Sequence, residues 1–532
     1  MAATPKSALE AAHPSAELYE YSPARKWVIA FSVMLGTILE VLDSSIVNVS
    51  LPHMQGSFSA SVDEIAWVVT SYLVAAGIMI PMTGWIAERF GRKRYFMISI
   101  AMFIGASMLC GVAQSLNQIV FFRLLQGAAG AAMMPLSQAI LMETFPPREQ
   151  AMSMAVWGIG MMVAPIMGPT IGGLITDAWS WRWNFYINVP IGSMAMFMVW
   201  RFVDDPAYMR QHRYGKIDYL GIACLVISLG LGEIVLDRGE RADWFESAWV
   251  IYCTALAISA MVLLIYHESR TDSPVIDLTI LENMNFTVPV TLVIFLTFTL
   301  YGTGILNPIF LQEVLGYTAS KAGVIMAPRG FGTMFSMIIL GTVARRGFDT
   351  RPLVGIGFFF VGYAMWQMSG LNLSSDSWRI VWPTILQGVG TGLVFPGLSA
   401  ASLTSVERPK MQRAASLYSV TRNLGAAIGT SYLTTLLIHR QQVNQSYLTE
   451  HVTVFNLPHI MMPMMHGMTI PEQMIAGHRE GLAMLYGMIQ RQAMMLSFND
   501  IYRILAVMMV ALVPTYLVLK RDTRNMPAEA AH

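Results

Sequence analysis

Apolar stretches of about 20 residues follow one another along most of the chain, separated by short polar segments. A helix of that length crosses a hydrocarbon core roughly 30 Å thick. Fourteen such stretches lie near residues 27–50, 64–86, 95–115, 118–141, 151–173, 185–203, 217–236, 247–267, 286–308, 319–343, 352–370, 380–401, 413–437 and 500–520. The pattern predicts an all-α polytopic membrane protein with 14 transmembrane helices and both termini on one side.

The basic residues orient this arrangement, because Lys and Arg favour cytoplasmic loops. With the N-terminus inside, 22 of the 34 basic residues fall on the inner side, 8 on the outer side and 4 within spans. The inner set includes groups at 89–94, 210–216, 345–351 and 520–524. We therefore expect cytoplasmic tails at 1–26 and 522–532, without a cleaved signal peptide.

The amino-acid composition argues against several classes of function. Hydrophobic residues make up 55% of the chain, charged residues only 13%, and the mean hydropathy is +0.51, all unlike a soluble protein. A net charge of +1 gives no basic footprint for nucleic acid. The three cysteines lie in apolar segments and predict neither a disulfide framework nor a zinc site. We also find no catalytic metal motif, nucleophile elbow or phosphate-binding loop that would favour an enzyme.

A weak internal repeat divides the chain. Residues 84–94 have a degraded echo at 341–351, and Gln126-Gly127 has one in Gln387-Gly388. We expect a six-helix bundle at 27–204, an inserted helix pair at 214–268 and a second six-helix bundle at 286–521. Repeated halves with a site between them are typical of secondary transporters.

The long segment 438–499 is predicted to lie outside the membrane as short amphipathic helices. It contains a Met-rich cluster: Met461, Met462, Met464, Met465, His466 and Met468. Thioethers suit Cu(I), so a metal-handling protein is one alternative. Because the chain holds 41 Met, compositional bias and a flexible partner-contact surface are favoured, with no metal site.

Ionisable residues inside predicted spans mark the candidate functional site, because burial in hydrocarbon is costly. Glu40 and Asp43 share one face of the first span, and Arg123 in the outer half of the fourth span needs a carboxylate partner. We expect these three residues to couple transport to protons. Alternatively, Asp43 lies near the outer surface and Arg123 bonds to backbone carbonyls. Further buried polar candidates are Gln126, Asn48, Asn188 and Arg422.

Two glycine-containing motifs predict helix contacts. After the second span, Gly84, Glu88, Arg89, Gly91 and Arg92 combine tight-turn residues with ion-pairing groups, which indicates a cytoplasmic gate as well as a positive-inside anchor. In the fifth span, small and helix-bending residues predict a rigid interface between the halves, and Gly425 and Gly429 have the same character. The fifth-span segment runs from Gly158 to Gly173, and its motif residues are Pro165, Gly168, Pro169, Gly172 and Gly173.

Several motifs together resemble the major facilitator superfamily, in particular its fourteen-helix drug:proton antiporter branch of the EmrB/QacA type. They are Asp43 to Pro52, Gly84 to Arg94, Arg123 to Gly127, Gly168 to Gly173 and Trp181 to Pro190, with Leu236 to Glu240, Asp243 to Phe245, Ile276 to Leu278 and Leu311 to Thr318 in support.

The resemblance implies a proton-driven exporter of hydrophobic or amphipathic compounds in the bacterial inner membrane, working by alternating access without a cofactor. Asp43 and Arg123 match the family's proton-coupling positions, whereas Glu40 lies outside its motif. Implied partners are a membrane-fusion protein of the HlyD/EmrA type and a TolC-type outer-membrane channel. A dedicated exporter of one metabolite, such as a siderophore or a fatty acid, is the main alternative.

Overall fold

The computed structural model describes residues 22–205, 218–271, 274–346, 348–407, 410–451 and 479–518, and every regular element within them is a helix. The first half contains α2 (Pro23–Phe58), α3 (Val62–Phe90), α4 (Arg92–Val112), α5 (Leu116–Gly130), α6 (Met133–Thr144), α7 (Pro147–Ala178), α8 (Trp183–Tyr186) and α9 (Asn188–Phe202). Next come α10 (Tyr219–Arg238) and α11 (Ala248–Glu268). The second half contains α12 (Met284–Ile309), α13 (Ala319–Arg345), α14 (Arg351–Met368), α15 (Ser377–Thr404), α16 (Met411–Glu450) and α18 (Arg479–Ala511).

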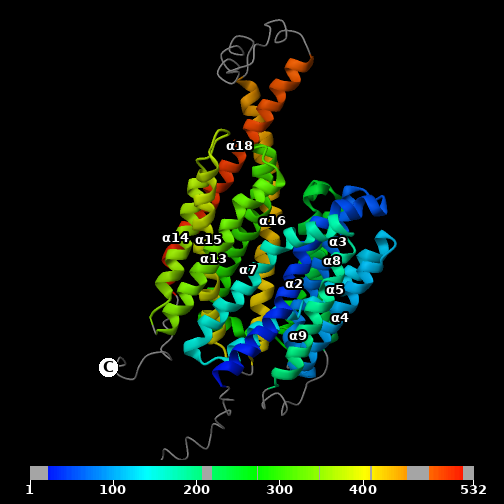
Figure 1. Cartoon of the computed structure of the whole chain (residues 1–532), viewed down its shortest axis with the longest axis vertical. Coiled ribbons are helices and arrows are strands. Elements are labelled where there is room, and N and C mark those ends of the chain that lie inside the picture. Colours follow the sequence, from blue (N-terminus) through cyan, green and yellow to red (C-terminus); the bar gives the residue numbers. More distant parts are fainter. Residues whose placement is uncertain are drawn as a thin grey trace, which may run out of the picture.

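Helices cover all fourteen predicted stretches, with α5 and α6 together forming the fourth. Within the described residues, eleven helical spans are long and apolar enough to cross a membrane; α9, α14 and α16 are not among them. The described chain begins and ends at the same end of the bundle, which we call the lower end, as in Figure 1. The basic tail residues at 520–524 and the group at 210–216 lie outside the described residues.

Local sequence explains where α3 begins and ends. The Ser61 hydroxyl accepts the Glu64 N–H at 3.2 Å, and the Glu64 carboxylate accepts the Ser61 N–H at 2.8 Å, so two backbone donors at the helix start are satisfied. At the other end Gly91 has a φ of +86°, a conformation that other residues rarely adopt. This glycine turns the chain directly from α3 into α4.

The predicted repeat is present in the packing of the two halves. A Cβ on Gly127 of α5 would lie 2.2 Å from the carbonyl oxygen of Tyr72 in α3. A Cβ on Gly388 of α15 would lie 2.1 Å from the carbonyl oxygen of Arg329 in α13. The two echoed Gln-Gly pairs thus mark equivalent points of backbone contact, one in each half.

The prediction that the fifth span lies between the halves is confirmed at Gly158, which packs on α13, and is wrong for Gly168 and Gly172. Gly168 and Gly172 pack against Ser45 and Ile46 of α2, in the same half, with hypothetical Cβ contacts at 2.5 and 3.1 Å. Gly173 has no atom within 4 Å of such a Cβ. Small residues serve whichever helix lies closest, and along this part of α7 that helix is α2. Of the motif's prolines, Pro165 is exposed, and Pro169 lies within α7.

The halves meet near the start of α7. Gly158 faces the Met337 side chain of α13, and Gly341 of α13 faces Met152 of α7, with hypothetical Cβ contacts at 2.9 and 2.7 Å. In the second half, Gly425 and Gly429 pack on α12 as Gly168 and Gly172 pack on α2. The two halves therefore repeat their internal packing and touch each other near the lower end.

The α10–α11 pair lies against both halves. The Thr70 hydroxyl of α3 donates to the Asp237 carboxylate of α10, and the Arg238 guanidinium lies over the Trp67 ring at 4.6 Å. Beyond α10, the Trp244 indole donates to the Thr435 hydroxyl of α16 at 3.1 Å. The pair therefore contacts α3 of one half and α16 of the other.

The expectation of short helices in 438–499 is wrong for its described ends, because α16 continues to Glu450 and α18 begins at Arg479. Residues 438–450 and 479–490 form a two-helix extension that rises above the bundle in Figure 1, whereas Met495 and Phe498 of α18 are buried in the bundle core. Asn444 bonds Ser497 at 3.0 Å, and Gln445 bonds Tyr486 at 3.2 Å. The Met-rich cluster at 461–468 lies outside the described residues.

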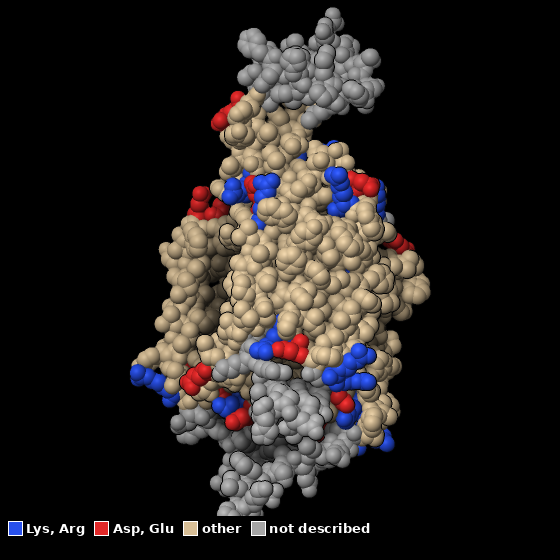
Figure 2. All heavy atoms as spheres, turned by 90° about the vertical axis from the view of Figure 1, so that its left-hand side faces the viewer, with Lys and Arg blue, Asp and Glu red and all other residues tan. Residues whose placement is uncertain are grey.

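The surface agrees with a membrane environment. Figure 2 shows the acidic and basic side chains of one face gathered at an upper and a lower level, with a nearly uncharged belt between them. Large apolar residues such as Phe121, Leu256 and Phe335 are exposed on the helices. An uncharged apolar belt of this kind is what a bilayer requires of the surface that it covers.

Candidate functional site

The predicted ion pair between the first and fourth spans is present, and its acid is Asp43. The Arg123 guanidinium donates to the Asp43 carboxylate at 2.6 Å, and both side chains are almost completely buried, at 1% and 0% exposed. The other carboxylate oxygen accepts from the amides of Gln126 at 2.8 Å and Asn188 at 2.6 Å. Asp43 is therefore buried away from the solvent-exposed surface, and both of its carboxylate oxygens accept hydrogen bonds.

Further contacts fix Arg123 in place. Its Nε donates to the Val68 carbonyl at 3.1 Å, its Nη1 also bonds Gln126 at 2.9 Å, and its guanidinium lies 4.2 Å from the centre of the Tyr72 ring. The Asn188 amide donates to Ser107 at 2.9 Å as well. Helices α2, α3, α4, α5 and α9 all contribute, so the network lies inside the first half rather than between the halves.

The surroundings of Asp43 supply the partners that a buried carboxylate needs. A buried charge is tolerated when it is paired and hydrogen-bonded, and Asp43 accepts hydrogen bonds from three side chains, Arg123, Gln126 and Asn188. Any movement that separates Arg123 from the carboxylate would remove its positive partner.

Glu40 has different surroundings from Asp43, although both belong to one face of α2. Its Oε2 atom is buried and has no hydrogen-bond partner among the described residues. Of the charges acting on its carboxyl, Arg422 of α16 has the larger effect and Asp43 the smaller. Glu40 thus lies outside the hydrogen-bond network that encloses Asp43.

The remaining buried polar candidates divide in the same way. Gln126 and Asn188 belong to the Asp43 network, and both are fully buried. Arg422 is 3% exposed and belongs to the surroundings of Glu40. Asn48 is exposed, so its prediction as a buried residue is wrong: one turn or more beyond Asp43, its position on α2 faces outward.

The predicted gate motif contributes an ion pair between the halves. Glu88 of α3 binds Arg413 of α16 through contacts of 2.8 Å and 2.9 Å from Nε and 2.6 Å from Nη2. A Cβ on Gly84 would lie 2.8 Å from the Arg413 Cα, so the backbones also touch. Asp277, in the segment that leads from α11 to α12, lies 3.9 Å from Arg413 and 3.6 Å from Lys410. We call Glu88, Arg413, Asp277 and Lys410 the Glu88–Arg413 cluster.

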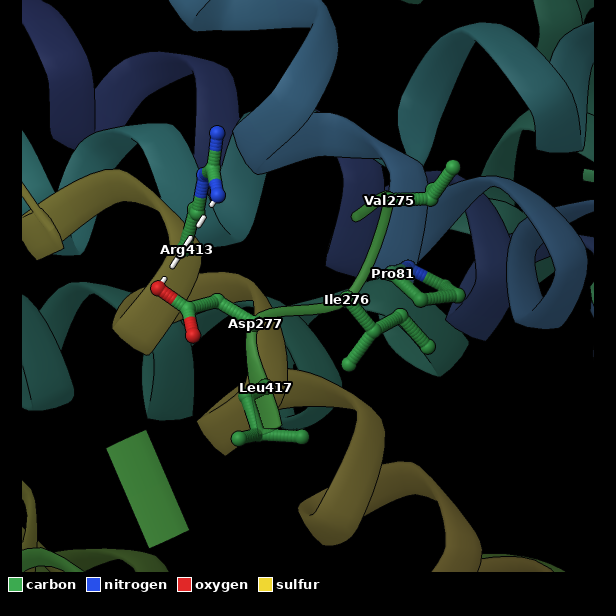
Figure 3. Close-up of a pocket in the computed structure, with 6 residues that line it drawn as sticks. All are labelled: Pro81, Val275, Ile276, Asp277, Arg413 and Leu417. Atoms are coloured by element: carbon green, nitrogen blue, oxygen red, sulfur yellow. Dashed lines mark ion pairs between the residues drawn. The ribbon is translucent and has the colours of Figure 1, made fainter. Parts of the chain in front are cut away.

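Figure 3 shows the carboxylate of Asp277 directed at Arg413, at the edge of a small pocket. Pro81, Val275, Ile276 and Leu417 complete its lining. The pocket is mostly apolar, and one side of it is the segment that follows the α10–α11 pair. Its position connects that pair to the contact between the halves.

The other gate residues act within the first half. Arg92 binds Glu143 of α6 at 2.5 Å, and both side chains are buried. Arg89 lies over the Trp85 ring at 5.8 Å, and Gly91 makes the turn into α4. The motif therefore combines one contact between the halves, through Gly84 and Glu88, with several that hold α3, α4 and α6 together.

Sequence reasoning missed the partners of these motifs. Tyr72 and Ser107 are ordinary polar residues in apolar spans, and nothing in the sequence aligns them with Arg123 or Asn188. Arg413 was counted only as a basic residue on the inner side. Asp277 had a signal, because it lies in one of the short motifs that carried the family resemblance.

The sequence pattern of the Major Facilitator Superfamily matches residues 33–430. The chain belongs to this superfamily. It is 36% identical over 480 residues to the Multidrug export protein EmrB of Escherichia coli (strain K12), covering 89% of this chain and 91% of that protein. It is 31% identical over 512 residues to the Fatty acid resistance protein FarB of Neisseria gonorrhoeae, covering 94% and 98%.

Solved structures agree with the superfamily fold. The human organic anion transporter MFSD10 has a TM-score of 0.60 at 13% identity, covering 92% of this chain and all of that one. A double Trp mutant of XylE has a TM-score of 0.61 at 12% identity, covering 95% and 98%. The superfamily, its relatives and the helical spans together establish a multi-pass transporter of the bacterial inner membrane, related to multidrug exporters, and not an enzyme.

Proposed function

We propose that this superfamily member is a proton-coupled antiporter that exports hydrophobic and amphipathic compounds by alternating access. The observation that carries the proposal is the buried Asp43–Arg123 pair, set within one half and separate from the contact between the halves. A titratable group inside a membrane protein is costly unless it has a function. The relatives named as multidrug export proteins support the choice of substrates.

In this proposal Asp43 is the proton carrier and Arg123 is its counter-charge. When the halves move, α2 and α5 shift, Arg123 releases the carboxylate, and Asp43 takes up a proton. The return movement restores the 2.6 Å ion pair and expels the proton on the opposite side. The proton gradient is the energy source, and the mechanism requires no cofactor.

We place the described conformation as closed at the lower end, which we take as cytoplasmic. The Glu88–Arg413 cluster and the contact of Gly341 with Met152 close this end. Gly341 belongs to α13 and Met152 to α7. At the opposite, upper ends of these two helices, the side chains of Leu174 in α7 and Val324 in α13 are 66% and 72% exposed. On this assignment the structure is outward-facing, both termini are cytoplasmic, and the chain is organised as bundles 27–204 and 286–521 around an inserted pair 214–268.

The two-helix extension supports an outer partner. If the lower end is cytoplasmic, residues 438–450 and 479–490 project away from the membrane on the outer side. A hydrophobic exporter with an outer projection suits a tripartite pump. We propose a membrane-fusion protein of the HlyD/EmrA type and, through it, a TolC-type channel as its partners.

One alternative has its own observation. A dedicated exporter of a fatty acid is favoured by the 31% identity to a protein named for fatty acid resistance. Such a protein would use the same proton mechanism with a narrower cavity. A siderophore exporter and a metal-handling protein have no comparable support among these relatives.

Transport in proteoliposomes tests the proposal. The purified protein is reconstituted with an internal pH-sensitive dye, and a panel of cationic, neutral and acidic fluorescent compounds is added. We expect several compounds to move against their gradients only when a proton gradient is present, with protons moving in the opposite direction. Transport of a single fatty acid would favour the alternative. Transport that ignores the proton gradient would refute coupling.

A further inference from the structure

Arg422 is a buried cation with unused hydrogen-bonding capacity. Its side chain is 3% exposed, and only Nη2 has a recorded bond, to Asn423 at 3.2 Å. Nε and Nη1 are both buried without a partner among the described residues. Leaving a buried charged donor unpaired costs free energy, so a group that completes these two bonds would bind favourably.

The helix that carries Arg422 lies at the contact between the halves. α16 packs against α3 and α6 of the first half, and Val420 contacts Ala76, Ile80 and Ala131 there. Glu40 of α2 is the acid of the first half whose carboxyl the charge of Arg422 influences, yet no ion pair within 4 Å joins the two in the described structure. The Tyr418 hydroxyl, one turn away on α16, is also buried without a partner among the described residues. Arg422, Tyr418 and Glu40 therefore each hold a buried polar atom to which the described residues supply no hydrogen bond.

Arg422 has no acidic partner from its own half on the neighbouring helices. Helices α12, α13, α14 and α15 contain no Asp or Glu, and the acid of α16 is Glu450 at its end. In the first half, Asp43 is already paired with Arg123. Glu40 forms no ion pair with Arg422 among the described residues, so the guanidinium of Arg422 keeps its unused donors.

We propose that Arg422 binds the carboxylate of acidic amphipathic substrates between the halves. This inference rests on the proposed export function and names a substrate class for it. The parallel N–H groups at Nε and one Nη of a guanidinium match the two oxygens of a carboxylate. Tyr418 supplies a third donor at the same place. Glu40 repels the bound anion and attracts cations, so it changes the relative affinity for acidic and cationic compounds without contacting the acid.

Direct binding tests the inference without transport. The full-length protein in lipid nanodiscs is titrated with dansyl-undecanoic acid, its neutral carboxamide and its trimethylammonium analogue, which share one apolar body. We expect the acid to bind more tightly than the carboxamide. Arg422→Gln should weaken the acid about ten- to a hundredfold and leave the carboxamide within about threefold, as loss of a charge-assisted bidentate contact predicts.

The controls separate this role from a structural one. Arg440→Gln removes the same charge from an exposed part of α16 and should leave all three affinities unchanged, because Arg440 is remote from Glu40 and approaches Asp500 at 4.0 Å. Glu40→Gln should tighten the acid and weaken the ammonium compound. Arg422→Lys, which keeps the charge, should retain part of the preference for the acid if Arg422→Gln proves unstable.

Equal weakening of all three probes by Arg422→Gln, or equal affinity of the unaltered protein for acid and carboxamide, would overturn the inference. The same probes in proteoliposomes separate it from the proposed function. If the acid binds through Arg422 but no probe is moved by a proton gradient, the proposed function fails and the inference stands. If all probes are exported without regard to charge, the function stands and the inference fails.

Discussion

Breaking the Glu88–Arg413 ion pair should open the lower end of the molecule. The pair joins α3 of one half to α16 of the other through three short N–H contacts to one carboxylate. Glu88→Gln keeps the shape of the side chain and removes its charge. We expect the equilibrium between closed and open lower ends to shift toward the open state.

The size of the shift follows from the geometry. A bidentate, charge-assisted contact contributes about 1.5 to 3 kcal/mol when buried. These side chains are 16% and 22% exposed, and Asp277 stays 3.9 Å from Arg413 in the variant, so we reduce the estimate to about 1 to 2 kcal/mol. That corresponds to a change of about five- to thirtyfold in the ratio of the two states.

Distances between spin labels at the lower ends of α7 and α13 measure this ratio. Glu143→Gln is the matched control, because it breaks the buried Arg92–Glu143 pair, which has similar geometry but lies within one half. The control should lower stability without changing the distance distribution. An unchanged distribution in Glu88→Gln, or an equal shift in both variants, would refute the assignment of this pair to the gate.

Two further predictions concern glycine positions, and thermal unfolding of the purified protein measures both. Gly127→Ala should lower the Tm strongly, because the new methyl group would lie 2.2 Å from the Tyr72 backbone. Overpacking costs about 1 to 3 kcal/mol even where side chains can move. The control Gly105→Ala should not lower the Tm, because no atom lies within 4 Å of its new methyl group. Gly91→Ala should destabilise the turn between α3 and α4 by about 1 to 3 kcal/mol, because its φ is +86°. An unaltered Tm for either variant would contradict the packing or the turn described above.

The sequence was sufficient to predict the ion pair at the core of the site. A guanidinium in hydrocarbon must find an acid, and few acids lie within the predicted spans, so Arg123 had to pair with Asp43 or Glu40. Spacing alone could not choose between them, and the family resemblance favoured Asp43. A separation of three residues places both acids on one face of α2, but the neighbouring helix differs from turn to turn along that face, and the fold decides which acid pairs with Arg123.

Packing partners were harder to predict than helices. The glycines of α7 correctly indicate close helix approach, yet they do not say which helix approaches: at Gly158 it is α13 of the other half, and at Gly168 and Gly172 it is α2. The length of α16 was also underestimated. Its continuation beyond residue 437 is polar and therefore invisible to a search for apolar stretches, although α18 stabilises it through side-chain hydrogen bonds such as Asn444 to Ser497.

Proton coupling through Asp43 is the central claim, and proton-driven transport by Asp43→Asn tests it most directly. The variant keeps the size of the side chain, and Asp43→Glu is the control that keeps the charge. In proteoliposomes the account predicts that Asp43→Asn no longer accelerates export when a proton gradient is imposed, while it still exchanges substrate between the two sides without a gradient. Chromatographic monodispersity and Tm confirm that it is folded. Full gradient-driven export by folded Asp43→Asn would contradict the account.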